Sequence, residues 1–232
     1  MKRRAIAPCT PEAVMRLCAD QGFSVSERQA QQLAEYLELL MKWNRVMNLV
    51  GANSWETCLE SLVSDSLHLT RYLENQTGMA QCCCANSEGD DAQIWDLGAG
   101  AGLPGIPLRM FWQRGEYWLV EAREKRSLFL ATVLARLVLP RTHVFHGRVE
   151  AFMPGRKAHF VLSRAFMPWR KVLELLTGKL HSGGHVLFMT RDPLERSLLP
   201  YGWELENTYT YCVGRAPRYF CSVTALPNIA PS

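Results

Sequence analysis

A glycine-rich turn between a short apolar run and a helix start constrains the fold of this chain more than any other segment. Residues 94–105 read IWDLGAGAGLPG. Glycine lets a backbone turn tightly and lets free main-chain N–H groups approach a ligand, because no Cβ stands in the way. Pro104 suits the first turn of a helix. The segment therefore predicts a strand, a ligand-binding turn and a helix in direct succession.

The rest of the chain after this turn repeats the order of strand and helix. Apolar or β-branched runs predict strands at 93–97, 116–121, 142–146, 159–163 and 184–190. Helical spacing predicts helices at 104–113, 124–138, 168–181 and 192–199. Residues 204–213 and 218–226 flank a turn without a helical pattern, which predicts an antiparallel hairpin. We therefore expect an α/β fold with a mostly parallel, Rossmann-like sheet and a C-terminal antiparallel hairpin, the layout of class I S-adenosylmethionine-dependent methyltransferases.

Three segments divide the chain. Residues 1–75 carry apolar residues at helical spacing after two candidate capping boxes, Ser24 to Glu27 and Asn53 to Glu56. They predict an N-terminal helical extension that packs on the catalytic domain. Residues 76–92 are rich in Asn, Gln, Gly, Ser and Asp, which predicts a mobile linker. Residues 93–232 make up the predicted Rossmann-like methyltransferase domain.

Composition limits the class of protein. The formal net charge of +4 and the pI of about 8.7 permit a nucleic-acid partner without requiring one. No apolar stretch reaches the roughly 18 residues that span a bilayer, and the segment after the N-terminal MKRR is too short and polar for a signal peptide. We therefore expect a cytoplasmic protein without a membrane partner. We also expect a monomer, a state that these features do not determine. The eight cysteines include no CxxC pair, so the run Cys82-Cys83-Cys84 predicts neither a metal site nor another function.

Two carboxylates decide which ligand suits the turn. Glu121 ends the second predicted strand, where an acid can accept hydrogen bonds from both ribose hydroxyls of a nucleoside. Asp96 stands directly before the glycines, where it would repel a pyrophosphate but attract the ammonium group of a methionine moiety, directly or through water. With Gly98 and Gly100 in the turn, the residues favour S-adenosylmethionine over a dinucleotide as the cofactor.

Further motifs identify a family. In chain order they are WNRVMNL at 43–49, DSL at 65–67, DLGAGAGLPGIP at 96–107, KR at 125–126 with FL at 129–130, RVE at 148–150 and SRA at 163–165. Their order and spacing resemble the RsmG family, also called GidB, of small-subunit (16S) ribosomal RNA guanine-7 methyltransferases. The resemblance runs from about residue 30 to about residue 224.

The resemblance implies roles for single residues. It places Gly98 and Leu103 at the methionine end of the cofactor, Glu121 at the ribose, Val149 and Glu150 at the adenine, and Arg164 at the mouth beside cofactor and RNA.

The reaction implied by the family makes few demands on side chains. The 7-nitrogen of guanine already has a lone pair in the ring plane, so methyl transfer needs no general base. The protein must align the reactants and exclude water. Arg164 is therefore the expected catalytic residue, because it would position the substrate. Its planar guanidinium can bind a phosphate or the guanine carbonyl oxygen. Because a surface arginine contributes little to stability, Arg164→Ala is expected to leave the melting temperature almost unchanged.

Other residues are candidates for contacts around this site. Asn44 and Asn48, four residues apart, are expected to brace a loop over the pocket. Phe166 or Trp169 could stack on an extruded base. The basic residues expected to bind RNA phosphates are Arg123, Lys125, Arg126 and Arg148.

The chain departs from the family pattern at two places. The family usually has Arg-His where this chain has Ser61 and Leu62, and it often has a lysine where this chain has Thr190. The departures leave the predicted cofactor residues intact but affect residues expected to face RNA. Two alternatives therefore stay open: a methyltransferase that acts on another substrate, such as protein or a small metabolite, and a non-catalytic, cofactor-binding module associated with the ribosome.

Overall fold

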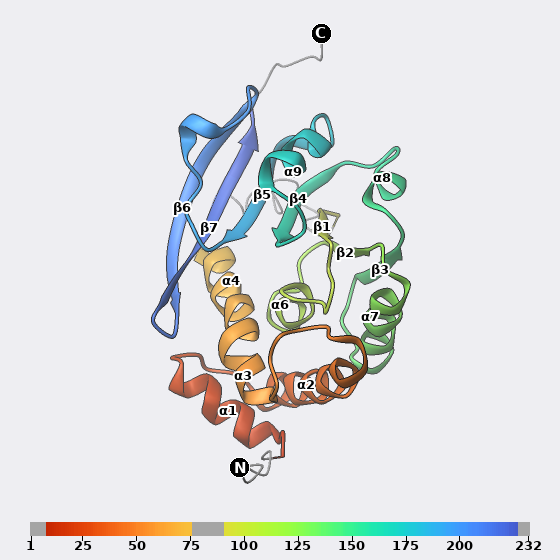
Figure 1. The fold of residues 1–232 in the computed structure, drawn as a ribbon, viewed down its shortest axis with the longest axis vertical. Coiled ribbons are helices and arrows are strands. Elements are labelled where there is room, and N and C mark those ends of the chain that lie inside the picture. Colours follow the sequence, from red (N-terminus) through yellow and green to blue (C-terminus); the bar gives the residue numbers. More distant parts are fainter. Residues whose placement is uncertain (1–7, 76–90, 227–232) are drawn as a thin grey trace.

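The computed structural model describes residues 8–75 and 91–226 of the chain (Figure 1). Its centre is a seven-stranded sheet in the order β3-β2-β1-β4-β5-β7-β6. The strands β1 to β5 pair in parallel, and β7 pairs antiparallel with both β5 and β6, which confirms the expected fold class. The strands are β1 (Gln93–Leu97), β2 (Glu116–Glu121), β3 (Thr142–His146), β4 (Ala158–Arg164), β5 (Leu180–Thr190), β6 (Trp203–Val213) and β7 (Ala216–Ala225).

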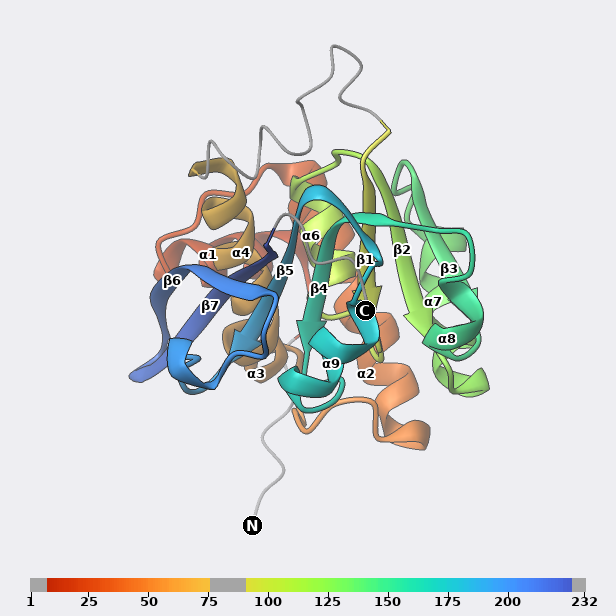
Figure 2. The ribbon, with the colours of Figure 1, turned by 90° about the horizontal axis from the view of Figure 1, so that it is seen from above.

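Helices cover both faces of this sheet, and each face has its own apolar core (Figure 2). Successive strand residues point to opposite faces, so Ile94 is buried in the first core and Trp95 in the second. The first core contains α6 (Gly105–Phe111) and α7 (Glu124–Arg136), and the second contains α8 (Val149–Phe152) and α9 (Trp169–Leu176). Burial on both faces explains why the strand sequences are nearly continuous apolar runs.

The N-terminal helices join the first of these cores. They are α1 (Pro11–Asp20), α2 (Glu27–Met47), α3 (Trp55–Cys58), the π-helical segment η1 (Leu59–Val63) and α4 (Ser64–Asn75). No helix in residues 8–75 or 91–226 is both long and apolar enough to cross a bilayer. Most of the linker expected at 76–92, including Cys82-Cys83-Cys84, lies outside the described residues.

The helix caps differ from the sequence expectation by one or two residues. Ser26 rather than Ser24 caps α2, because the Ser26 hydroxyl accepts from the Gln29 main-chain N–H at 3.3 Å while the Ser26 N–H donates to the Gln29 side chain at 2.9 Å. Ser54 rather than Asn53 caps α3, and its hydroxyl accepts from the main-chain N–H of Thr57. In the capping box of α2, Gln29 occupies the position at which the expected motif has a glutamate.

Elements near the end of the sheet also differ from the expectation. The helix expected at 192–199 is only the 3-10 turn η2 (Arg196–Leu198), because Pro193 and Pro200 limit the segment at both ends. The helix expected at 168–181 already ends at Leu176, since β5 starts at Leu180. The four residues of α8 are too few to show a periodic pattern in the sequence.

A buried arginine stabilises the end of the sheet at which β2 and β3 begin. Arg109 on α6 is 0% exposed and donates hydrogen bonds to the Thr142 hydroxyl and to four main-chain carbonyls. The carbonyls belong to Trp112, Arg114, Gly115 and Pro140. The guanidinium therefore replaces the hydrogen bonds to water that these main-chain carbonyls lose on burial.

We predict that Arg109→Leu lowers the free energy of unfolding by more than about 3 kcal/mol, because several carbonyls lose their donor at once. Urea unfolding measures this change. The matched control Arg136→Leu removes an exposed arginine from the end of α7 and should cost less than about 0.5 kcal/mol. Equal stability of the Arg109→Leu variant and the unchanged protein would contradict the structural role given to this guanidinium.

Candidate functional site

The ends of four central strands lie in register at the C-terminal edge of the sheet. Leu97 of β1 pairs with Val120 of β2 and with Ser163 of β4, and Arg164 pairs with Met189 of β5. The glycine turn after β1, the end of β2 and the end of β4 therefore leave the sheet side by side. Open α/β sheets bind their ligands at this edge.

Glu121 connects the end of β2 to the glycine turn. One carboxylate oxygen accepts a hydrogen bond from the Gly100 main-chain N–H at 2.8 Å, and the other accepts from the Arg123 N–H at 2.8 Å. The residue is 5% exposed, so it is held rigidly and does not lie free in solvent. Each oxygen keeps a second lone pair for a ligand.

A cleft of about 260 Å³ opens beside this carboxylate. The cleft combines one fixed carboxylate with two arginines and with small and apolar residues, so it could hold a nucleoside whose hydroxyl groups donate to Glu121. The lining residues are Gly98, Val120, Glu121, Ala122, Arg123, Arg126, Gly147, Val149, Ala165 and Phe166. Glu150, expected at the adenine, is exposed beside Val149 and is not among them.

The glycine turn is also tied to the N-terminal helices. The Tyr36 hydroxyl of α2 is fully buried and donates to the Ala101 carbonyl at 2.8 Å. Gly100 has a φ of 58°, and its N–H is aimed at Glu121, so the turn has one fixed path. The Leu103 side chain is 6% exposed and belongs to the apolar core, so a cofactor contact at this residue would come from its main chain.

Asp96 lies beneath the turn. Its carboxylate is 1% exposed and accepts a hydrogen bond from the Tyr117 hydroxyl at 3.1 Å. Burial raises the pKa of Asp96 to about 7, against the opposing effects of Tyr117, Arg164 and the Gly105 main chain. In this structure the carboxylate is covered, so direct contact with a cofactor ammonium group is not available to it, and the expected role of Asp96 would require an intervening water.

Arg164 forms a partly buried ion pair. Its Nη2 donates to Asp65 Oδ2 at 2.9 Å, and the other Asp65 oxygen accepts from the Tyr211 hydroxyl at 3.0 Å. The Asp65 side chain is only 4% exposed and that of Arg164 is 22% exposed. The contacts of this pair therefore join α4, β4 and β6. The expectation that Arg164 is a surface residue with little effect on stability is wrong.

A second cavity, of about 310 Å³, is lined by both residues of this ion pair; we call it the acceptor cavity. The Nε atom of Arg218 is buried there and has no hydrogen-bond partner among the described residues. The residues where the chain departs from the family pattern, Leu62 and Thr190, both lie on its wall. The full lining is Leu49, Val50, Gly51, Leu62, Asp65, Arg164, Ala165, Met189, Thr190, Arg191, Tyr211 and Arg218.

Ala165 lines both the cleft and the acceptor cavity. Its φ of 52° is in the left-handed region, which is costly for a residue with a side chain. The turn directs Phe166 onto the glycine loop, where a Cβ added to Gly98 would lie 2.4 Å from the Phe166 ring. The expectation that this ring stacks on an extruded base is untested; in this structure it covers Gly98.

The residues expected to bind RNA are brought together only in part. Arg123, Lys125 and Arg126 surround a shallow cavity with Val46 and Met47 at the end of α2. Arg148 is exposed at the start of α8 and lines none of the cavities described above. In the described part of the chain, no cluster of three or more His, Cys, Asp or Glu side chains could hold a metal ion.

Sequence analysis missed the residues that hold Arg164. Asp65 belongs to one of the family motifs, but 99 positions separate it from Arg164, and Tyr211 is 146 positions from Asp65. The π-helical segment η1, directly before α4, has no recognisable signal in the sequence. Such segments occur frequently at functional sites, and here the segment contributes Leu62 to the acceptor cavity.

The raised pKa of Asp96 gives a prediction with a defined sign. Between about pH 4 and pH 7 the folded chain holds a proton on this carboxyl that the unfolded chain has released, so stability falls as the pH rises, by at most about 1.4 kcal/mol per unit. Asp96→Asn removes this titration and keeps an acceptor for Tyr117. Its free energy of unfolding, relative to the unchanged protein, should therefore rise from pH 5 to pH 8. A pH-independent difference for Asp96→Asn would refute the assignment.

The ion pair predicts that Arg164→Ala is destabilising. Loss of the guanidinium leaves the buried Asp65 with Tyr211 as its hydrogen-bond donor, which should cost roughly 1.5–3 kcal/mol. Thermal unfolding measures the effect, and Asp65→Asn in the same background should restore part of the loss because it removes the unpaired charge. A melting temperature unchanged by Arg164→Ala would show that the pair contributes nothing.

Comparisons with known proteins match this geometry. The sequence model of the rRNA small subunit methyltransferase G family matches residues 29–198. The chain is 48% identical over 218 residues to ribosomal RNA small subunit methyltransferase G of Nitratidesulfovibrio vulgaris (strain DP4), which covers 94% of each chain. It is 39% identical over 213 residues to the protein of that name from Lawsonia intracellularis, which covers 90% of this chain and 93% of the relative.

A solved structure of MtNAS in complex with S-adenosylmethionine has a TM-score of 0.54 at 14% identity, and the match covers 94% of this chain and 78% of that one. This likeness concerns the fold alone. The family match covers most of the chain and agrees with the relatives. The chain belongs to the rRNA small subunit methyltransferase G family.

Proposed function

We propose that this chain transfers the methyl group of S-adenosylmethionine to the 7-nitrogen of a guanine in small-subunit (16S) ribosomal RNA. The observation that carries the proposal is that the cofactor cleft and the acceptor cavity meet at Ala165. Direct transfer requires donor and acceptor atoms about 3–3.5 Å apart. Two cavities that share Ala165 would place the cofactor and the substrate side by side, as such a transfer needs. Family membership supports ribosomal RNA as the substrate, because the relatives are named for it.

Residues of the cleft would hold the cofactor. Glu121 would accept from the ribose hydroxyls, and Val149 would pack against the adenine. Gly98 lines the cleft under the Phe166 ring, where we place the methionine end. When bound, S-adenosylmethionine supplies an electrophilic methyl group on a sulfonium. Phe166 lies over Gly98 and would help to exclude water from the reacting atoms.

The acceptor cavity would receive the guanine. Its 7-nitrogen has a free lone pair, so no residue needs to remove a proton. Arg164 uses one N–H on Asp65 and keeps other donors for the guanine carbonyl oxygen or a phosphate. Arg218 lines the same cavity, and its buried Nε, which has no partner among the described residues, is a second candidate donor for this ligand. Arg164 thus acts by orienting the base.

We extend the proposal to the rim and the setting of the enzyme. Arg123, Lys125, Arg126 and Arg148 would attract RNA phosphates, although only the first three lie together. A ribosomal RNA substrate favours a cytoplasmic location. A monomer is the simplest state for an enzyme whose cleft and acceptor cavity come from one chain, and sedimentation analysis tests it.

The test is methyl transfer from labelled S-adenosylmethionine to small ribosomal subunits, free 16S RNA and a protein extract. We expect label in small-subunit RNA and 7-methylguanosine after nuclease digestion. Label only in protein or metabolites would support the alternative of another methyltransferase substrate. Cofactor binding without any transfer would support a non-catalytic module, and either result would overturn the proposal.

Variants of Arg164 test the role of the guanidinium. Arg164→Ala should lower kcat/KM for RNA by one to three orders of magnitude, since each tenfold corresponds to about 1.4 kcal/mol of transition-state stabilisation. Arg164→Lys should recover only part of the rate, because a point charge does not replace a planar fork. Assays are run at a temperature where each variant is folded, with Arg136→Ala as the control. Unchanged turnover of Arg164→Ala would remove this residue from the reaction.

A further inference from the structure

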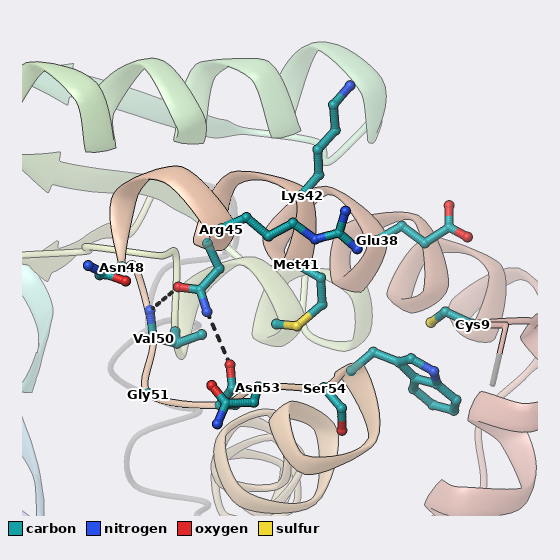
Figure 3. A pocket seen from close by; sticks show the side chains of 13 residues that line it. Cys9, Glu38, Met41, Lys42, Arg45, Asn48, Val50, Gly51, Asn53 and Ser54 are labelled. Carbon is teal, nitrogen blue, oxygen red and sulfur yellow. Dashed lines mark hydrogen bonds between the residues drawn. The ribbon is translucent and has the colours of Figure 1, made fainter. Parts of the chain in front are cut away.

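A further cavity is not used by the proposed reaction. It measures about 920 Å³ and lies between the outer side of α2 and the loop at residues 48–54 (Figure 3). We call it the α2 groove. Its lining consists of Cys9, Glu38, Met41, Lys42, Asn44, Arg45, Asn48, Val50, Gly51, Ala52, Asn53, Ser54 and Trp55.

The α2 groove adjoins the acceptor cavity. Val50 and Gly51 line both, so a short piece of this loop is the wall between them. Consecutive nucleotides of an extended strand are only a few ångströms apart. A strand that delivers its guanine to Arg164 on one side of this wall therefore has a neighbouring nucleotide within reach of the groove on the other side.

The wall has a fixed shape. The Asn44 side chain accepts from the Val50 main-chain N–H at 2.8 Å and donates to the Ala52 carbonyl at 3.1 Å, as the dashed lines in Figure 3 show. Asn48 ends α2 with a φ of 49°, which turns the chain into the loop. Asn44 therefore braces the loop as expected, whereas Asn48 makes no side-chain hydrogen bond to it within the described residues.

The chemistry of the groove suits single-stranded RNA. Lys42 and Arg45 are exposed along α2 and form no ion pair within the described residues, so both charges are free for phosphates. The exposed Asn53 side chain on the loop can donate to and accept from base edges, whereas the Ser54 hydroxyl already caps α3. Met41 gives apolar surface for a base. Glu38 would repel phosphate, which favours a backbone path on the Arg45 side of the groove.

We propose that the α2 groove binds the single-stranded RNA that flanks the target guanine, and so acts as a second substrate subsite. The proposal rests on the proposed function, since it takes RNA as the substrate. It gives Lys42 and Arg45 a role in substrate affinity and none in the methyl-transfer step. It also gives Asn44 a positioning role, because this side chain holds the wall that both cavities share.

The experiment compares the double variant Lys42→Ala/Arg45→Ala with Arg28→Ala, an exposed arginine on the same helix that lies outside the groove. Methyl transfer to free 16S RNA and to small ribosomal subunits is measured at several salt concentrations. We expect KM for RNA to rise about tenfold in the double variant, with kcat changed less than twofold and S-adenosylmethionine affinity unchanged. Loss of two phosphate contacts should also reduce the slope of log affinity against log salt by about 1.4. Arg28→Ala should match the unchanged protein in all four quantities.

Each other outcome overturns one claim. If the unchanged protein methylates no RNA, the proposed function fails. If it methylates RNA and the double variant keeps its KM and salt slope, the groove is not an RNA subsite. If KM rises only for small subunits and not for free RNA, the groove binds ribosomal protein and the proposal is wrong. Should the double variant unfold, Arg45→Ala and Asn53→Ala, measured separately for binding of a fluorescent single-stranded RNA without cofactor, give the same decision.

Discussion

The ion pair between Arg164 and Asp65 is the interaction on which the arrangement of the site depends. A carboxylate that is 4% exposed needs partners, and Arg164 from β4 and Tyr211 from β6 supply them. The same contacts fix the guanidinium at the end of β4, next to the turn at Ala165. One buried charge therefore links the N-terminal helices, the parallel strands and the terminal hairpin, and it orients the residue proposed to meet the substrate.

The cofactor side is organised by hydrogen bonds to the glycine turn. Glu121 holds Gly100 from the sheet, and Tyr36 holds Ala101 from α2. The N-terminal helices thus shape the cleft as well as covering one face of the sheet. They also supply the wall of the α2 groove, so the proposed cofactor and substrate surfaces depend on the same packing contacts.

Local patterns allowed much of this architecture to be predicted from the sequence. The strand–glycine turn–helix order and the position of Glu121 follow from short-range rules, and the structure has both. The pairing of Arg164 with Asp65 was not predictable, because contacts across 99 positions depend on how the helices pack. The covered position of Asp96 and the short η2 also depend on context, since burial and flanking prolines outweigh local propensity. The structural weight of Arg164 was missed for this reason.

Because Asp65 fixes the guanidinium, we expect it to serve the reaction through Arg164. A double-mutant cycle with Asp65→Asn and Arg164→Gln, measured as kcat/KM for methylation of small-subunit RNA, determines whether the two residues act together. If Asp65 acts through Arg164, the double variant should be no slower than Arg164→Gln alone, although Asp65→Asn alone lowers the rate. If the two losses instead multiply in the double variant, the residues act independently, and the ion pair is not what orients the substrate.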